Sequence, residues 1–309
     1  MSIQHTPGSP EARDEKPGCD GHGGCGSGSC DGAGESGCGG EGGCACGGHG
    51  ASPSRQDAST VLGTIRVQVQ RYRPDTDEEP HLVEYEVPWG ADTSVLDALQ
   101  WIKDNADPSL AFRWSCRMAI CGSCGFMLNG VPRLGCEQFV RDYAPGPLRV
   151  EPLENMAVER DLVVDLEPFM SALTEVRPWL VEDPEKPLEE PANRQTPKQM
   201  LAYHDYAMCI NCMLCYAACP QVSLASAFLG PAAVTAAVRY NKDSRDHGAA
   251  QRLPVLDREE GLWSCTFVGA CSTACPKGVD PAAAIQQAKI AAAASWAAEF
   301  VLPRRGGVR

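Results

Sequence analysis

The spacing of eleven cysteines that follow residue 58 limits what this chain can fold into. The first group reads C-x4-C-x2-C-x11-C, which is typical of the 2Fe-2S site of plant-type ferredoxins, and it consists of Cys116, Cys121, Cys124 and Cys136. The second group reads C-x2-C-x2-C-x3-C-P, the bacterial ferredoxin pattern, in which the fourth thiolate binds a second cluster; it consists of Cys209, Cys212, Cys215 and Cys219. The two patterns predict two different cluster-binding modules in one chain.

The third group follows the bacterial pattern with one ligand missing, and it consists of Cys265, Cys271 and Cys275. If Cys265 is the first ligand and Cys271 the third, the middle position falls on Val268, which cannot bind iron. Each run gives its last thiolate to the other cluster, so a complete 4Fe-4S site is predicted from Cys209, Cys212, Cys215 and Cys275. The remaining three thiolates predict a 3Fe-4S cluster and belong to Cys219, Cys265 and Cys271.

Structural zinc and disulfides are the alternatives for so many cysteines. A structural zinc site closes four ligands into a tetrahedron, usually as two C-x2-C pairs or with histidines, and neither module has that arrangement. Disulfides require an oxidising compartment, and no apolar signal segment precedes the first domain. The spacing therefore favours iron-sulfur clusters.

Charge and hydropathy narrow the range of partners. The net charge of -13 argues against nucleic acid, whose phosphates would repel the protein. No run approaches the ~18 consecutive apolar residues of a membrane-spanning helix. The most apolar late segment, Ala282–Leu302, is rich in alanine and is interrupted by Gln286, Gln287, Lys289 and Glu299. We therefore expect any membrane attachment to come through another subunit.

Residues 1–58 are rich in glycine and contain the six remaining cysteines, Cys19, Cys25, Cys30, Cys38, Cys44 and Cys46. Such a segment buries too little apolar area to offset its ordering entropy, so we expect a disordered tail. Its cysteines, with His22 and His49, have the chemistry to bind a soft metal ion, but their irregular spacing favours a tail without a fixed metal.

The pattern after the tail predicts a β-rich domain over residues 59–158. Ile65, Val67 and Val69 alternate with polar residues, which indicates a half-buried strand, and a second strand follows at Leu82–Val87. Asn129-Gly130 is a hairpin signal after Phe126–Leu128, and Leu148–Val150 closes the set.

A helix is predicted between the second strand and the cysteine loop, capped by Asp92 or Thr93. Its apolar positions at helical spacing are Val95, Leu96, Leu99 and Ile102. In the cysteine loop, Gly122 and Gly125 are interpreted as allowing backbone amides to approach the sulfurs. Strands, one helix and a cluster loop together predict the β-grasp fold.

Residues 159–309 are predicted to form an all-α, bacterial-ferredoxin-like domain that binds the 4Fe-4S and 3Fe-4S clusters. We expect a linking helix over Asp161–Leu180, an acidic stretch at Val181–Pro191, and helices from Thr196 onward with the cysteine runs in the turns. Prolines that suit helix starts follow the cysteine runs and open the last helix, at Pro220, Pro276 and Pro281. The predicted fold class of the whole chain is therefore α+β.

Three segments resemble the iron-sulfur subunit of fumarate reductase and succinate dehydrogenase, and most of all its fumarate reductase branch. They read FRWSCRMAICGSCG from Phe112, MCINCMLCYAACP from Met208, and WSCTFVGACSTACPKGVDPAAAIQQAK from Trp263. The stretch YNKDSRDHG from Tyr240 is similar as well, and the resemblance runs from about Thr64 to about Lys289. The tail lies outside the resemblance.

The resemblance implies an electron-transfer subunit of a membrane-bound complex. A flavoprotein subunit with FAD would interconvert succinate and fumarate, and membrane anchor subunits would help to hold a quinone. The 2Fe-2S cluster would face the flavin, the 3Fe-4S cluster the quinone, and the 4Fe-4S cluster would lie between them. The chain would sit peripherally on the cytoplasmic side of the cell membrane, and it would have no turnover alone.

The resemblance also implies a quinone site near Lys289, Thr266 and Gln286, with Lys289 supplying a cation. Residue type alone also allows a solvated helix lysine there. Many succinate dehydrogenases have a histidine directly after the first cysteine of the third group, where this chain has Thr266 as fumarate reductases do. Menaquinone is therefore the expected quinone.

Two other functions fit parts of the pattern. A soluble electron carrier would use the same clusters without a flavin partner. A ferredoxin-like subunit of another oxidoreductase, such as a thiol-dependent fumarate reductase, fits the first two cysteine groups but would favour further cysteine-rich motifs downstream.

Overall fold

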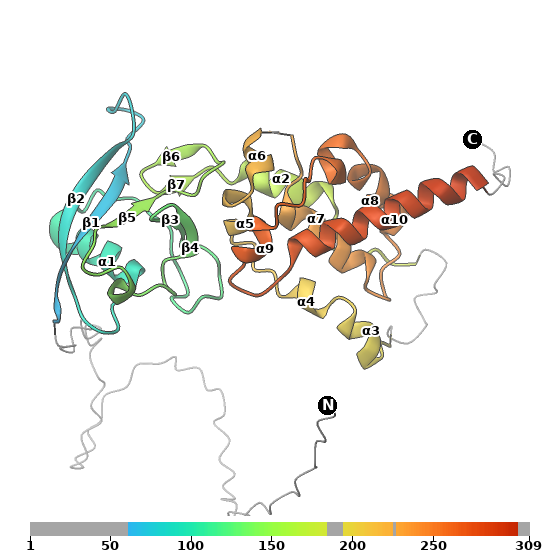
Figure 1. The fold of residues 1–309 in the computed structure, drawn as a ribbon, viewed down its shortest axis with the longest axis horizontal. Coiled ribbons are helices and arrows are strands. Elements are labelled where there is room, and N and C mark those ends of the chain that lie inside the picture. The colour runs from blue at the N-terminus through green and yellow to red at the C-terminus, as the bar shows by residue number, and fades with distance from the viewer. Residues whose placement is uncertain (1–60, 184–193, 225–226, 302–309) are drawn as a thin grey trace, which may run out of the picture. The chain divides into compact units, whose positions relative to one another are not determined.

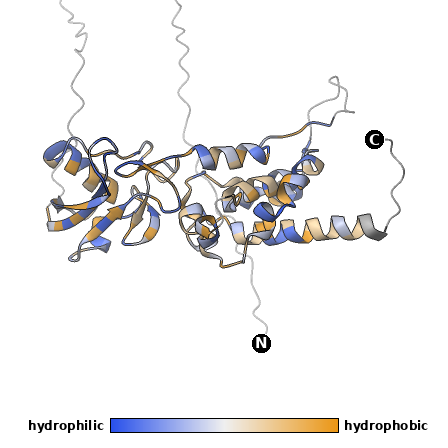
Figure 2. Ribbon diagram, turned by 90° about the horizontal axis from the view of Figure 1, so that it is seen from above, coloured by the Kyte–Doolittle hydropathy of each residue, from blue (hydrophilic) through white to orange (hydrophobic). Residues whose placement is uncertain are grey.

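The computed structural model describes residues 61–183, 194–224 and 227–301, and Figure 1 shows the strands and helices that they form. Strands dominate the first part of these residues and helices the second, as the α+β prediction requires. The predicted tail and most of the acidic stretch lie outside the described residues. Along the described residues, no helix is both long and apolar enough to cross a bilayer, and Figure 2 shows hydrophilic residues interspersed along the last helix.

A five-stranded sheet forms the first part, in the order β2-β1-β5-β3-β4. Its strands are β1 (Gly63–Arg71), β2 (His81–Trp89), β3 (Gly125–Leu128), β4 (Val131–Leu134) and β5 (Leu148–Glu151). β1 pairs in parallel with β5, whereas the other neighbours are antiparallel. This mixed sheet confirms the predicted strands, and a short 3-10 helix, η2 (Val140–Asp142), precedes β5.

The predicted alternation along β1 is confirmed, because Ile65, Val67 and Val69 are all buried. The predicted hairpin is also present: Asn129 and Gly130 have φ angles of 48° and 77° and connect β3 to β4. Positive φ at both central residues is the geometry that Asn-Gly favours in a two-residue hairpin.

Helix α1 (Val95–Trp101) packs on the sheet, and the π-helical segment η1 (Ile102–Ala106) continues it. The four apolar residues predicted for its buried face are buried: Val95, Leu96, Leu99 and Ile102. The predicted cap was wrong, because Ser94 is the N-cap and forms a capping box with Asp97. The Thr93 hydroxyl instead accepts a hydrogen bond from the Gly90 amide at 2.8 Å, one turn too early to cap the helix.

The predicted linking helix was too long, since only α2 (Glu167–Glu175) is helical. The residues before it form a two-stranded hairpin, β6 (Val158–Arg160) and β7 (Val163–Val164), so the predicted boundary after residue 158 falls within β6. Asp161 lies between these strands, fully buried, and accepts a hydrogen bond from Arg71 Nε at 3.0 Å. This buried ion pair with β1 holds the segment out of a helix.

The second part is helical, as predicted. Its elements are α3 (Pro197–Leu201), α4 (His204–Ala207), α5 (Leu214–Ala217), α6 (Pro220–Leu224), α7 (Pro231–Asn241), α8 (Ala249–Leu256), the π-helical η3 (Glu259–Trp263), α9 (Ala270–Thr273) and α10 (Pro281–Val301). Pro220 and Pro281 begin helices as expected, but Pro276 lies in a turn, so its predicted role was wrong.

Arg252 of α8 connects the end of α2 to the helical part. Its guanidinium is fully buried and forms an ion pair with Asp246 at 2.6 Å. It also donates to three backbone carbonyls after α2, those of Val176, Arg177 and Trp179. One charged side chain thus fixes the segment that leads into the second module.

Candidate iron-sulfur sites

The loop that carries the first cysteine group directs backbone amides at its own sulfurs. Cys116 Sγ accepts from the amides of Met118, Ile120 and Cys121 at 3.3–3.4 Å. Cys136 Sγ accepts from the Ala119 amide at 3.3 Å. Left-handed backbone at Arg117 and Ala119, with φ of 57° and 56°, gives the loop the curvature that brings these amides inward.

The electrostatics of this loop suit thiolate ligands. Burial alone would raise the pKa of Cys121, but hydrogen bonds from the Cys116 amide and from Ser123 lower it to about 6. Burial raises the pKa of Cys124 to about 12, so this thiol would lose its proton only to a metal. Amides that point at sulfur stabilise negative charge there, and hydrogen bonds to the sulfurs are one determinant of cluster potential. The residues present therefore fit a cluster.

Gly122, directly after Cys121, lies against the second cysteine group. A Cβ at Gly122, whose φ is 73°, would lie 2.8 Å from Cys212 Cβ and 2.9 Å from Cys212 Cα. A Cβ at Gly125 would lie 3.3 Å from the Cys212 carbonyl oxygen. The absence of side chains at these glycines thus lets the two cysteine loops touch, which is a different reason from the predicted approach of amides to sulfur.

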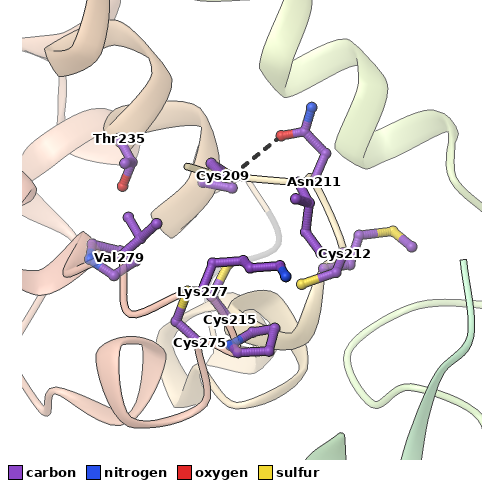
Figure 3. Close-up of a pocket in the computed structure, with 13 residues that line it drawn as sticks. Cys209, Asn211, Cys212, Cys215, Thr235, Cys275, Lys277 and Val279 are labelled. Carbon is purple, nitrogen blue, oxygen red and sulfur yellow. Dashed lines mark hydrogen bonds between the residues drawn. The ribbon is translucent and has the colours of Figure 1, made fainter. Parts of the chain in front are cut away.

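The second module contains two cavities lined by cysteine (Figure 3 shows the first). The first is lined by four cysteines from α5 and its flanking loops and from the turn before α10: Cys209, Cys212, Cys215 and Cys275. Burial raises the pKa of Cys212 to about 11 and that of Cys215 well above its ordinary value. These thiols would remain neutral without a metal to bind the thiolate.

The second cavity is lined by the other three cysteines, Cys219, Cys265 and Cys271. Val268 also lines this cavity, with 64% of its surface exposed. It is therefore not a core packing residue, and it lies where the bacterial pattern would have a cysteine. Burial raises the pKa of Cys271 to about 11, as in the first cavity.

The cysteines of the second module are arranged around two cavities. All eleven cysteines of the described residues are free, and within residues 61–183, 194–224 and 227–301 no three metal-binding side chains converge on one point. A structural zinc ion holds its sulfurs ~2.3 Å from one centre, so it needs such convergence. A cluster spreads its thiolates over several irons, which suits cysteines arranged around a cavity.

Of the three residues expected at a quinone site, Thr266 lines the second cavity and Lys289 lies beside it. Lys289 of α10 donates from Nζ to the Cys265 carbonyl oxygen at 2.7 Å, and this Nζ lies 5.6 Å from the centre of the Trp263 ring. Thr266 lines the cavity, and its hydroxyl accepts from Gln221 Nε2 at 3.1 Å. Gln286 Nε2 is buried without a hydrogen-bond partner among the described residues. Lys289 is thus half-buried and bound rather than freely solvated.

Sequence reasoning missed three residues near these sites: Asn155, Gln221 and Lys277. Asn155 has a left-handed φ of 65°, and its Nδ2 donates to the carbonyls of Tyr216, Ala217 and Cys219 at 2.9–3.2 Å. Gln221 follows Cys219-Pro220, and Lys277 follows Cys275-Pro276. Their positions directly after the cysteine runs were the only available signal, whereas Asn155 had none.

Comparisons with known proteins agree with this division into two modules. Residues 66–171 match the 2Fe-2S iron-sulfur cluster binding domain family, and residues 205–279 match the 4Fe-4S dicluster domain family. The chain is 51% identical over 250 residues to the fumarate reductase iron-sulfur subunit of Haemophilus influenzae, covering 78% of this chain and 97% of that one. It is 53% identical over 247 residues to the corresponding subunit of Mycobacterium tuberculosis, covering 80% and 100%. This chain belongs to the family of fumarate reductase and succinate dehydrogenase iron-sulfur subunits.

A more distant relative agrees with this membership, and one solved structure shares the fold. The succinate dehydrogenase iron-sulfur subunit of Paracoccus denitrificans is 37% identical, with 72% of this chain and 86% of that one covered. A chain of the Mycobacterium smegmatis Sdh1 complex in the apo form superposes with a TM-score of 0.70, covers 77% of this chain and 99% of its own length, and is 24% identical, which shows the shared fold.

Family membership confirms the predicted fold class and the predicted function as an electron-transfer subunit of an oxidoreductase complex. The predicted 2Fe-2S and 4Fe-4S cofactors are likewise confirmed by the two domain families. The dicluster family assigns two clusters to the helical module, where the structure has two cysteine-lined cavities. Membership decides against a soluble carrier and against a subunit of an unrelated oxidoreductase.

Proposed function

We propose that this chain conducts electrons between FAD in a flavoprotein subunit and a membrane quinone, through three clusters held by its eleven downstream cysteines. The observation that carries the proposal is the sorting of the second module's cysteines into one cavity with four thiols and another with three. When bound, the clusters accept and release single electrons. The protein positions them, buries their ligands and supplies the hydrogen bonds and charges that tune their potentials.

The proposed ligands follow the same sorting. The 2Fe-2S cluster would be held by Cys116, Cys121, Cys124 and Cys136. The 4Fe-4S cluster would be held by Cys209, Cys212, Cys215 and Cys275, and the 3Fe-4S cluster by Cys219, Cys265 and Cys271. The contact of Gly122 with Cys212 supports an order in which the first and second clusters are neighbours. This ligand set also agrees with the proposed division into a tail of residues 1–58 and domains of residues 59–158 and 159–309.

The surface around the second cavity supports a quinone and membrane anchor subunits at that end. Trp263, Phe267 and Val268 are 47%, 58% and 64% exposed, and all lie within six positions of one another. Contiguous exposed apolar side chains mark protein or membrane contact sites. Lys289 beside Cys265 would supply a cation for quinone oxygen, and Thr266 and Gln286 would supply polar groups. We assign the chain to the cytoplasmic face of the membrane, attached through anchor subunits, with menaquinone as its quinone.

Exchange of single cysteines tests the crossed ligand set. In the purified complex, Cys275→Ala should abolish the EPR signal of the 4Fe-4S cluster and leave the 3Fe-4S signal, although Cys275 belongs to the third run. Cys219→Ala should abolish the 3Fe-4S signal and leave the 4Fe-4S signal, although Cys219 belongs to the second run. If each variant instead loses the cluster of its own run, the thiolates do not cross and the assignment fails.

The electron-transfer role is tested by separating the subunits. The chain purified without a flavoprotein should reduce no fumarate with an artificial electron donor, whereas the assembled complex should. Fumarate turnover by the flavin-free chain would contradict the proposal.

A further inference from the structure

Of the described residues that line the first cysteine-lined cavity, a single one is charged. Besides the four cysteines, the described residues around it are apolar or neutral: Ile210, Asn211, Met213, Ala232, Thr235, Pro276, Val279 and Pro281. The remaining residue is Lys277, two positions after Cys275. Among the described residues, no carboxylate lines the cavity to balance this cation.

Along the part of the chain that the structure describes, Lys277 differs from the other half-buried lysines in having no hydrogen bond, ion pair or ring contact. Lys103 donates to the carbonyls of Pro108 and Leu110 at 3.1 and 2.7 Å, and Lys289 donates to that of Cys265. Lys242 lies 6.0 Å from the centre of the Tyr206 ring. Lys277 is half-buried too, yet it makes no hydrogen bond or ion pair with any residue that the structure describes. Figure 3 shows its side chain extending into the cavity among the cysteines.

A 4Fe-4S cluster with four thiolate ligands is negatively charged, and reduction adds one more negative charge. Charge near a buried cluster is one of the factors that set its potential, and Coulomb interactions are stronger there than in water. An ammonium group beside the cluster stabilises the reduced form more than the oxidised form. The cation and the anionic cluster are thus complementary in charge and place.

We propose that Lys277 is the counter-charge of the 4Fe-4S cluster and raises its reduction potential. This inference rests on the proposed ligand set of the first cavity. It assigns to Lys277 an electrostatic role in tuning the middle step of the electron path. The role depends on the positive charge rather than on a particular hydrogen bond.

Redox titration of the intact complex, followed by EPR of the reduced 4Fe-4S cluster, tests the proposal. Lys277→Gln should shift the midpoint potential of this cluster downward, while Lys277→Arg should keep it near the unmodified value. Lys242→Gln is the matched control, because it removes a half-buried lysine of the same module that lines neither cysteine cavity. The control should leave the potential unchanged.

An unchanged potential in Lys277→Gln, or an equal downward shift in Lys277→Arg, would overturn the inference. If Lys277→Gln assembles no 4Fe-4S cluster, the result for Lys277→Arg decides. A 4Fe-4S cluster of unchanged potential in Lys277→Arg supports the role of the positive charge, and loss of the cluster from Lys277→Arg as well refutes that role. Absence of the 4Fe-4S signal from the unmodified complex would instead refute the ligand set. The two failures are therefore distinguishable.

Discussion

Replacement of Gly122 by alanine tests whether direct contact between the two cysteine loops matters. The added Cβ would lie 2.8 Å from Cys212 Cβ, about 0.6 Å inside the 3.4 Å at which ordinary contacts begin. It would also lie 2.9 Å from Cys212 Cα and 3.1 Å from the Ile210 carbonyl oxygen. Backbone atoms cannot rotate away as a flexible side chain can, so one loop must shift.

Two costs contribute to the loss of stability in Gly122→Ala. The left-handed φ of 73° costs an alanine about 1–2 kcal/mol. Overpacking against Cys212 adds about 1–3 kcal/mol. Gly130→Ala is the matched control, since its φ is 77° and a Cβ there would meet nothing within 4 Å. Gly130→Ala should lose only the free energy of the left-handed backbone. Gly122→Ala should therefore be less stable than Gly130→Ala by about 1–3 kcal/mol.

Thermal denaturation of the cluster-loaded complex, followed by visible absorbance, measures this difference, with the control run in parallel. EPR relaxation of the reduced 2Fe-2S cluster gives a second measurement, because magnetic coupling to the reduced 4Fe-4S cluster weakens as the loops separate. Gly122→Ala should lower the denaturation midpoint further than Gly130→Ala and slow this relaxation. Equal midpoints and identical relaxation in the two variants would refute the importance of the contact.

Three further changes test the quinone site, the N-terminal tail and the buried ion pair of Arg252. Lys289→Ala should reduce quinone-linked turnover roughly tenfold to a hundredfold, because it removes a charged hydrogen bond of about 1.5–3 kcal/mol. Succinate oxidation by an artificial acceptor at the flavin should change little. Equal damage in both assays would indicate a structural lysine. Deletion of residues 1–58 should leave all three cluster signals and quinone-linked activity intact, and loss of any signal at equal expression would show that the tail cysteines contribute. Arg252→Met should destabilise the complex by about 3–5 kcal/mol, because it leaves Asp246 buried without its charged partner. The control Arg258→Met should cost only about 0–1 kcal/mol, because Arg258 and Glu175 form an exposed pair. Similar melting temperatures of the two variants would contradict this difference.

Local patterns in the sequence were sufficient to predict much of the fold. The alternation of Ile65, Val67 and Val69 and the Asn129-Gly130 turn depend on neighbouring residues, and both were confirmed. The cap of α1 was missed because three consecutive candidates precede the helix, and only Ser94 is positioned to accept from the Asp97 amide. Errors of one or two residues are expected where several capping residues adjoin.

Contacts between distant residues account for the larger errors. The segment after residue 160 has an apolar pattern compatible with a helix. Asp161, however, pairs with Arg71, 90 positions earlier, and the chain around Asp161 forms the hairpin of β6 and β7. The sequence did not indicate that Gly122 also lies against the second cysteine group, where an added Cβ would be closest to Cys212. Lys277 was not singled out, because its isolation from partners is visible only when the cavity is assembled. Sequence spacing sorted the cysteines of the second module into the same two groups that line its two cavities, but it did not indicate the other residues around them.

The most direct test of the central claim is EPR of the purified complex carrying Val268→Cys, compared with the unmodified complex and with Val268→Ala. Val268 is exposed and lines the cavity of Cys219, Cys265 and Cys271, so its replacement costs little packing. The cysteine restores the pattern C-x2-C-x2-C-x3-C-P and supplies the thiolate for a fourth iron. In Val268→Cys we expect the oxidised 3Fe-4S signal to disappear and a 4Fe-4S cluster of lower potential to replace it. In Val268→Ala we expect the 3Fe-4S signal to persist. An oxidised 3Fe-4S signal at full intensity in Val268→Cys would contradict the vacant-ligand explanation and the cluster assignment built on it.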